Sequence, residues 1–99
     1  MDRSVVVRYE TKPEAAEENA RLVAAVYAAL AEAAPDGFRY ATYRLADGVS
    51  FVHVATLTAG DNPLDTLPAF AEFQKDLAAR VVAPPVPSQA TVVGSYGLS

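Results

Sequence analysis

The sequence has 99 residues, of which 52% are hydrophobic and 20% are charged, so we expect one compact domain over residues 1–99. Its net charge of −4 at pH 7 argues against nucleic acid or an anionic membrane surface as the partner. With no cysteine, disulfides and thiolate metal sites are excluded, and a single histidine without neighbouring ligands indicates that the chain has no metal site.

The first half of the chain predicts a strand followed by a long helix. Consecutive valines favour an extended, buried conformation over Ser4–Glu10. The next four residues, Thr11-Lys12-Pro13-Glu14, have the form of a capping box that starts a helix. Apolar residues then recur every three or four positions as far as Ala34, which predicts one amphipathic helix, and Pro35-Asp36-Gly37 ends it.

A hairpin is predicted next. Phe38–Leu45 and Ser50–Leu57 are rich in aromatic and β-branched residues, and Asp47-Gly48 supplies a tight turn between them. The second of these strands is unusual because it is apolar at both odd and even positions, whereas a strand with one wet face alternates. We therefore expect both of its faces to be covered.

The last third predicts a second helix and a final strand. Residues 59–63 form a turn-rich loop, and Thr66-Leu67-Pro68 looks like the start of a helix whose apolar stripe reaches Val81. The proline-rich residues 83–87 end that helix and impose a stiff, extended connection. A fourth strand is expected over Gln89–Tyr96.

The order of the elements places the chain in the α+β class, as a ferredoxin-like βαββαβ fold. Such a fold has a four-stranded antiparallel sheet with two helices on one face. The helices leave the other face uncovered, although Ser50–Leu57 and the valines of Ser4–Glu10 are apolar toward it. The simplest cover is the same face of a second copy, which predicts a homodimer. The alternative is that valine and alanine tolerate a wet face.

Four stretches together resemble a known family. They are VVRYETKPE, GFRYATYRLADG, FVHV and PAFAEFQKDLAARV, and they span almost the whole chain. In hydrophobic pattern and turn placement the sequence resembles the dimeric α+β barrel superfamily, and within it the antibiotic-biosynthesis-monooxygenase type of domain. The resemblance implies a homodimer with an apolar cavity between sheet and helices in each subunit. In characterised members this cavity binds aromatic phenols, quinol-type signal molecules or haem, and several members oxygenate without metal or flavin.

The sequence departs from the haem-degrading members of that superfamily. Those proteins use an asparagine in the first strand, a tryptophan at the end of the third strand and a histidine on the second helix. The matching positions here look like Val7, Leu57 and the region of Ala69, and the chain has no tryptophan. Haem degradation by that route is not expected, and no cofactor is predicted.

His53 is the candidate catalytic residue. Strand alternation puts it on one face with Phe51, Ala55 and Leu57, and the resemblance implies that this face lines the cavity. A neutral imidazole in an apolar pocket could deprotonate a phenol or an activated carbon and so make an anion that reduces dioxygen. The other interpretation is a packed histidine that makes one hydrogen bond.

The candidate ligand-binding residues are aromatic apart from one amide, which lies with the apolar stripe of the first helix and either orients a ligand or reaches water. Tyrosine offers a flat apolar wall with a hydroxyl at its rim, although a purely structural role fits most of the tyrosines. The full set is Asn19, Tyr27, Tyr40, Phe51, Phe70 and Phe73.

Two functions of different classes follow. The first is a cofactor-independent monooxygenase acting on a small aromatic or polyketide-like molecule, with His53 as the base. The second is a non-catalytic domain that binds a small ligand or assembles as a dimer. No apolar run is long enough for a signal peptide or a membrane span, so we expect a cytoplasmic protein, and the alanine-rich, lysine-poor composition suggests a bacterial one.

Overall fold

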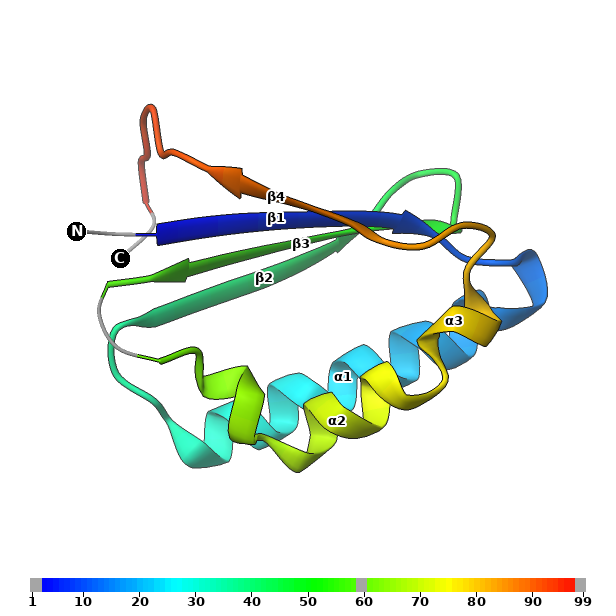
Figure 1. The fold of residues 1–99 in the computed structure, drawn as a ribbon, viewed down its shortest axis with the longest axis horizontal. Helices are drawn as coiled ribbons and strands as arrows, with labels where there is room; N and C mark the ends of the chain where they lie inside the picture. Colours follow the sequence, from blue (N-terminus) through cyan, green and yellow to red (C-terminus); the bar gives the residue numbers. More distant parts are fainter. Residues whose placement is uncertain (1–2, 59–60, 98–99) are drawn as a thin grey trace.

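The computed structural model, which describes residues 3–58 and 61–97, is a sheet with helices packed against one of its faces (Figure 1). The elements are β1 (Arg3–Glu10), η1 (Pro13–Ala15), α1 (Ala16–Ala33), β2 (Phe38–Arg44), β3 (Ser50–Leu57), η2 (Pro63–Thr66), α2 (Pro68–Lys75), α3 (Leu77–Arg80) and β4 (Val86–Ala90). The sheet order is β2-β3-β1-β4, with antiparallel pairing throughout. This confirms the predicted ferredoxin-like α+β fold. No helix within the described part of the chain is long and apolar enough to cross a membrane.

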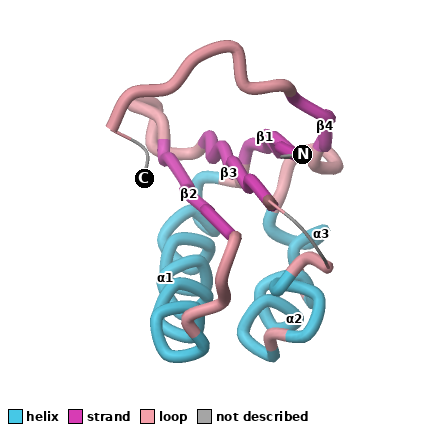
Figure 2. Tube along the Cα trace, turned by 90° about the vertical axis from the view of Figure 1, so that its left-hand side faces the viewer, coloured by secondary structure: helices cyan, strands magenta, loops and turns pink. Residues whose placement is uncertain are grey.

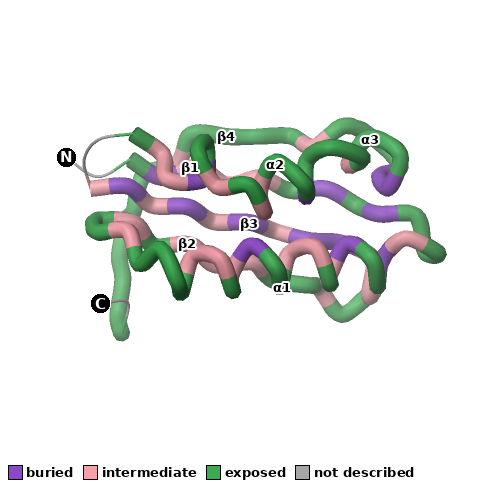
Figure 3. The backbone as a smooth tube through the Cα atoms, turned by 90° about the horizontal axis from the view of Figure 1, so that it is seen from below, coloured by how far each residue is buried: buried purple, intermediate pink, exposed green. Residues whose placement is uncertain are grey.

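Strand pairing puts the side chains of the two sheet faces in register. Val5 pairs with Ala55 and Tyr9 pairs with Phe51, so that the inward-facing residues of β1 lie beside those of β3. In β3 the residues that face the helices are buried, whereas Val52, Val54 and Thr56 on the other face are only half-buried (Figure 3). The hydrophobic core lies between the sheet and the helices and consists of Tyr9, Val26, Phe51, Leu64, Phe73 and Val81.

The first helix begins later than predicted. Thr11 does not cap it, because its N–H and its hydroxyl both donate to the Val49 carbonyl and it forms an isolated β-bridge with Val81. A turn of 3₁₀ helix follows from Pro13, and the α-helix starts at Ala16. Ala34 ends that helix in the left-handed conformation, just before the predicted Pro35-Asp36-Gly37 stop.

The fourth strand is misplaced in the sequence-based prediction. It occupies Val86–Ala90, within and just after the proline-rich stretch, and not Gln89–Tyr96. Proline is tolerated there because β4 is an edge strand, where a missing N–H can face away from the sheet. The register sets Ala90, the last residue of β4, opposite Ser4, which is the second residue of β1, so the two strands end together at this edge of the sheet.

Residues 91–97 instead arch across the helix-free face of the sheet, from the β4 side toward β2 (Figure 2). Between this arch and the sheet is a groove of about 430 Å³, lined by Arg39, Tyr40, Ala41, Tyr43, Val54, Thr56, Val92 and Ser95. Val93 and Tyr96 on the arch are 101% and 100% exposed. The predicted turn-rich loop 59–63 is described only from Asp61 onward, and Ala59 and Gly60 lie outside the described residues.

Two glycines with positive φ give a matched test of the turns. A side chain at Gly37 (φ +70) would collide with the Thr58 hydroxyl, whereas one at Gly48 (φ +79) would meet nothing within 4 Å. We expect Gly48→Ala to cost about 1–2 kcal/mol of unfolding free energy through backbone strain alone. Gly37→Ala should cost about 1 kcal/mol more, because Thr58 must give up its hydrogen bond to the Gly37 carbonyl. Urea unfolding measures both, and equal losses would contradict the expected collision.

Candidate active site

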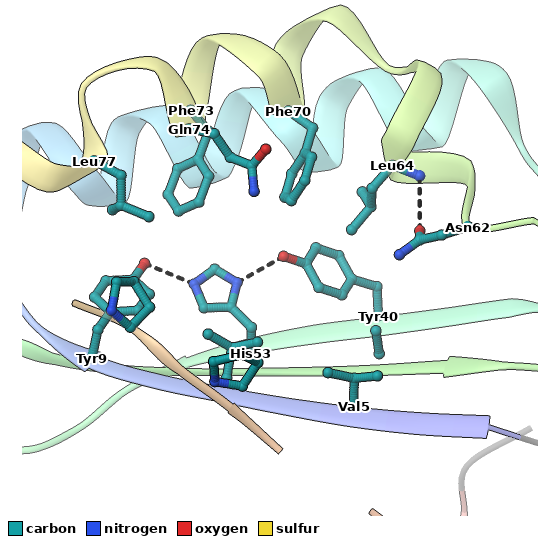
Figure 4. A pocket seen from close by; sticks show the side chains of 14 residues that line it. Val5, Tyr9, Tyr40, His53, Asn62, Leu64, Phe70, Phe73, Gln74 and Leu77 are labelled. Carbon is teal, nitrogen blue, oxygen red and sulfur yellow. Dashed lines mark hydrogen bonds between the residues drawn. The ribbon is translucent and has the colours of Figure 1, made fainter. Parts of the chain in front are cut away.

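A cavity of about 330 Å³ lies between the inner face of the sheet and α2 (Figure 4). Its walls are mostly apolar and aromatic, which is typical of pockets for small organic ligands. They are formed by Val5, Val7 and Tyr9 of β1, Tyr40 of β2, His53 and Ala55 of β3, Asn62, Leu64, Phe70, Phe73, Gln74, Leu77, Pro85 and Pro87. Gln74 and Pro87 are the exposed members of this lining, so the cavity opens between α2 and β4.

His53 lies at the floor of the cavity with both ring nitrogens hydrogen-bonded. Its side chain is directed toward the helices by strand alternation, and the residue is 6% exposed. Nε2 is 2.7 Å from the Tyr9 hydroxyl, and Nδ1 is 2.7 Å from the Tyr40 hydroxyl and 3.0 Å from Thr42 Oγ1. The two tyrosines come from strands on either side of β3, and they flank the imidazole (Figure 4).

The hydrogen-bond network continues behind the cavity wall on both sides. The Asn19 amide donates to the Tyr9 hydroxyl at 2.9 Å, and Arg80 Nε donates to Asn19 Oδ1 at 3.1 Å. Arg80 Nη2 also donates to the Phe73 carbonyl at 2.6 Å. On the other side, Tyr27 and Thr42 share a hydrogen bond of 2.8 Å between their hydroxyls.

Burial keeps the groups around His53 uncharged at neutral pH. Desolvation lowers the pKa of His53 from 6.5 to about 4. Desolvation also raises the pKa of Tyr9 to about 12, although the Asn19 hydrogen bond and the positive charge of Arg80 pull it down. The pKa of Tyr40 is raised well above its ordinary value, again mainly by burial. The cavity therefore presents a neutral imidazole between two neutral phenols.

Aromatic rings stack around the imidazole. The Tyr9 ring centroid lies 5.3 Å from that of His53 with an interplanar angle of 27°, and Phe73 lies 5.6 Å from His53 on the helix side. Phe70 continues the wall, with its centroid 5.9 Å from that of Phe73. Flat ring faces favour a flat, apolar ligand.

The predicted site residues divide into two groups. His53, Tyr40, Phe70 and Phe73 line the cavity together. Asn19 and Phe51 lie behind Tyr9, which Asn19 hydrogen-bonds and against which Phe51 stacks at 5.6 Å. Tyr27 lies outside the cavity, where its ring stacks on that of Tyr40 at 5.2 Å and its hydroxyl hydrogen-bonds that of Thr42.

Sequence reasoning missed three residues of the network: Tyr9, Thr42 and Arg80. Strand alternation could have found Tyr9, because it shares a face with Val5 and Val7. The sequence-based prediction sets Arg80 away from the apolar stripe of the second helix, yet it is 4% exposed. Arg80 follows the buried Phe73 by seven residues, or about two helical turns, so its spacing could have placed it at the edge of that stripe.

The described residues contain no group of three or more histidine, cysteine, aspartate or glutamate side chains that could hold a metal ion. The polar groups that face the cavity are hydroxyls, amides and one imidazole. Such groups can hydrogen-bond an organic ligand and move its protons.

Solved structures share this fold at low sequence identity. SnoaB of Streptomyces nogalater, described as a cofactor-independent oxygenase, is 22% identical over 97% of both chains, with a TM-score of 0.69. A Bacteroides thetaiotaomicron protein described as a candidate antibiotic biosynthesis monooxygenase is 14% identical, with a TM-score of 0.80 over 99% of this chain and 94% of that one. A Mycobacterium tuberculosis protein is 19% identical, with a TM-score of 0.76 over 96% and 98% of the respective chains.

No protein-family model and no curated protein matches the sequence. The structural likeness nevertheless confirms, at the level of the fold, the resemblance to antibiotic-biosynthesis-monooxygenase domains that the sequence predicted.

The low pKa of His53 makes stability depend on pH. In the unfolded chain the imidazole takes up a proton near pH 6.5, whereas in the folded protein it does so only near pH 4. The stabilising contribution is therefore complete above pH 6.5 and is lost as the pH falls toward 4, at about 1.4 kcal/mol per pH unit, or roughly 3 kcal/mol in all. Urea unfolding of the wild type and of His53→Gln at a series of pH values measures it. Parallel curves for the two proteins would contradict this assignment.

Proposed function

We propose that the protein is a cofactor-independent oxygenase of a small, flat, weakly acidic aromatic molecule that binds in the cavity above His53. The observation that carries the proposal is a neutral, buried imidazole held between two phenol hydroxyls at 2.7 Å in an aromatic pocket. The chemistry that such a base can supply is removal of a proton from the ligand, so the substrate must carry an acidic O–H or C–H. A cavity of about 330 Å³ is at the lower end of the volumes that hold drug-sized ligands.

The proposed reaction oxidises an activated methylene group with dioxygen as the co-substrate. His53 takes one proton from the ligand, directly or through a neighbouring hydroxyl, and a carbanion or phenolate remains. This anion gives an electron to dioxygen, and recombination of the two radicals forms a carbon–oxygen bond. Loss of water from the hydroperoxide leaves a carbonyl, so that Ar₂CH₂ + O₂ gives Ar₂C=O + H₂O. The Tyr40 hydroxyl at the cavity wall can donate to the developing oxyanion.

The fold of SnoaB supports the oxygenase proposal, because a protein described as a cofactor-independent oxygenase has the same arrangement of sheet and helices. At 22% identity the likeness supports the reaction class only by analogy. The named residues of the site therefore rest on the geometry of the cavity.

A second function is favoured by one observation: both nitrogens of His53 already have partners within the protein. This geometry also fits a structural histidine in a cavity that binds an aromatic ligand without changing it. The two functions differ in whether oxygen is consumed when the ligand is bound.

We also propose that the functional unit is a homodimer formed through the helix-free face of the sheet. That face carries apolar side chains on each strand, including Val6, Val54 and Tyr43, which is 55% exposed. The apolar side chains of the arch, Val93 and Tyr96, have no cover within the described chain. A second copy would bury the face and the arch together, since a two-fold axis brings two identical apolar surfaces into contact.

Substitution of His53 tests the oxygenase proposal. With an anthrone as the trial substrate, we expect the wild type to accelerate oxygen uptake and anthraquinone formation. His53→Gln should lower kcat at least about 100-fold, which is the lower end of what a general base contributes. Glu32→Gln, an exposed change on α1, is the control. Binding of the anthrone without oxygen uptake would instead support the non-catalytic function.

A charge on the helix-free face tests the dimer. We expect the wild type to sediment as two chains and Val54→Asp to sediment as one, because an aspartate in the centre of the interface would be buried without a partner. Val82→Asp makes the same change at an exposed position elsewhere and should leave the dimer intact. A folded wild-type protein that sediments as a single chain would rule out the proposed assembly.

A further inference from the structure

Arg80 is a buried guanidinium that forms no ion pair with a carboxylate of residues 3–58 or 61–97. The ion pairs found among the described residues are Arg21 with Glu18 and Arg44 with Glu17, and neither includes Arg80. Its Nε donates to Asn19 Oδ1, its Nη2 donates to the Phe73 carbonyl, and its guanidinium carbon lies 5.3 Å from the centre of the Phe73 ring. A charge buried without a counter-charge depends on the polar groups that it hydrogen-bonds, and it orients them in turn.

Arg80 fixes the orientation of the Asn19 amide. Arginine carries donors only, so the atom of Asn19 that faces it must be the carbonyl oxygen. The amide nitrogen of Asn19 then faces the Tyr9 hydroxyl, to which it donates at 2.9 Å. Asn19 is 0% exposed, so water does not compete for either end of the amide.

Tyr9 carries this polarity to His53. Its oxygen accepts from Asn19, and the partner placed to receive its single proton is Nε2 of His53 at 2.7 Å. A neutral imidazole that accepts at Nε2 has its proton on Nδ1. Nδ1–H then donates to the Tyr40 hydroxyl or to Thr42 Oγ1, which lie 2.7 and 3.0 Å away.

We propose that Arg80, Asn19 and Tyr9 form a polarised chain that holds His53 as the Nδ1–H tautomer and gives the two cavity tyrosines opposite roles. Tyr9 passes the proton of the ligand to Nε2, and Tyr40 donates its own proton to an oxygen of the ligand. Asn19 and Arg80 are positioning residues, because they do not line the cavity and act through Tyr9. The roles assigned to Tyr9 and Tyr40 toward a ligand rest on the proposed function, whereas the tautomer of His53 does not.

The proton transfer is balanced and needs no oxidant. As the ligand proton bonds to the Tyr9 oxygen, the original Tyr9 O–H bond breaks and that proton bonds to Nε2. The products are a ligand anion and an imidazolium, and Tyr9 is unchanged. The positive charge of Arg80 stabilises negative charge that develops on the Tyr9 oxygen during the transfer, just as it lowers the pKa of that phenol. In this tautomer Nδ1–H donates to the Tyr40 oxygen, so the Tyr40 proton remains available for donation to the ligand.

The two roles restrict the class of ligand. The Tyr9 and Tyr40 hydroxyls lie on opposite sides of the imidazole (Figure 4). A ligand that uses both must present an acidic O–H or C–H near Tyr9 and a carbonyl or phenol oxygen near Tyr40. A flat hydroxyaromatic ketone or an anthrone has this arrangement.

The tautomer can be measured without a substrate, because His53 is the single histidine of the chain. We expect ¹H–¹⁵N correlation spectra of histidine-labelled protein at about pH 8, above the ordinary histidine pKa of about 6.5, to show the proton on Nδ1. In Asn19→Asp the carboxylate can accept from both Arg80 and the Tyr9 hydroxyl. Tyr9 must then accept from the imidazole, so the proton should move to Nε2.

Asn62→Asp is the matched control, because it makes the same change at a cavity-wall residue that does not belong to the Arg80–Asn19–Tyr9 series. The aspartate keeps an oxygen that can accept from the Leu64 N–H, as Asn62 Oδ1 does. It should leave the proton on Nδ1. A second variant, Tyr9→Phe, removes the donor to Nε2 and keeps the ring, and it should leave a mixture of tautomers.

An Nε2–H tautomer in the wild type would overturn the proposal, and so would an Nδ1–H tautomer that persists in both Asn19→Asp and Tyr9→Phe. These outcomes are separate from the oxygenase test, since the tautomer is set before any ligand binds. If the expected tautomer is found but no oxygen is consumed, the polarised Arg80–Asn19–Tyr9 series is supported and the proposed reaction is ruled out.

Discussion

The burial of the His53 imidazole between the sheet and α2 is the constraint on which the rest of the site depends. A polar ring with two nitrogens is costly to bury unless both are satisfied, and here hydroxyls from the strands on either side satisfy them. Those hydroxyls are themselves buried and need hydrogen-bond partners of their own. Asn19, which Arg80 hydrogen-bonds, donates to Tyr9, and Thr42 also lies within hydrogen-bond distance of His53 Nδ1. Burial also lowers the pKa of His53 to about 4, so the imidazole is neutral at pH 7 and takes up a proton less readily than an exposed histidine.

The two faces of the sheet have different tasks. The inner face supplies the floor of the cavity and packs against the helices, whereas the outer face carries half-buried valines beneath the arch of residues 91–97. The apolar side chains of the outer face suit contact with another apolar surface, and the inner face suits a ligand with acidic protons.

Most of the fold could be predicted from the sequence, because its signals are local. The valines of β1, the Asp47-Gly48 turn and the apolar alternation of β3 each specify their own conformation. The prediction was wrong for β4, because a strand that contains Pro87 is stable only at a sheet edge, and its edge position depends on pairing with β1. The site was predicted in part: alternation grouped His53 with Phe51 and Ala55, and the family resemblance implied that this face lines the cavity. The burial of Arg80 was missed because arginine is rarely buried, although it lies seven residues after Phe73 and so on nearly the same side of the helix.

The sequence by itself determined which residues share a face of each strand and helix, because side-chain direction follows from backbone geometry. It therefore determined that His53 points with Phe51 and Ala55, and that Tyr40 and Tyr43 point apart. Only the tertiary structure decided that Tyr9 and Tyr40 meet the two nitrogens of one imidazole, and that Arg80 reaches Asn19 from 61 positions away. Such meetings are set by strand order, register and helix packing, which are long-range interactions that no local pattern contains.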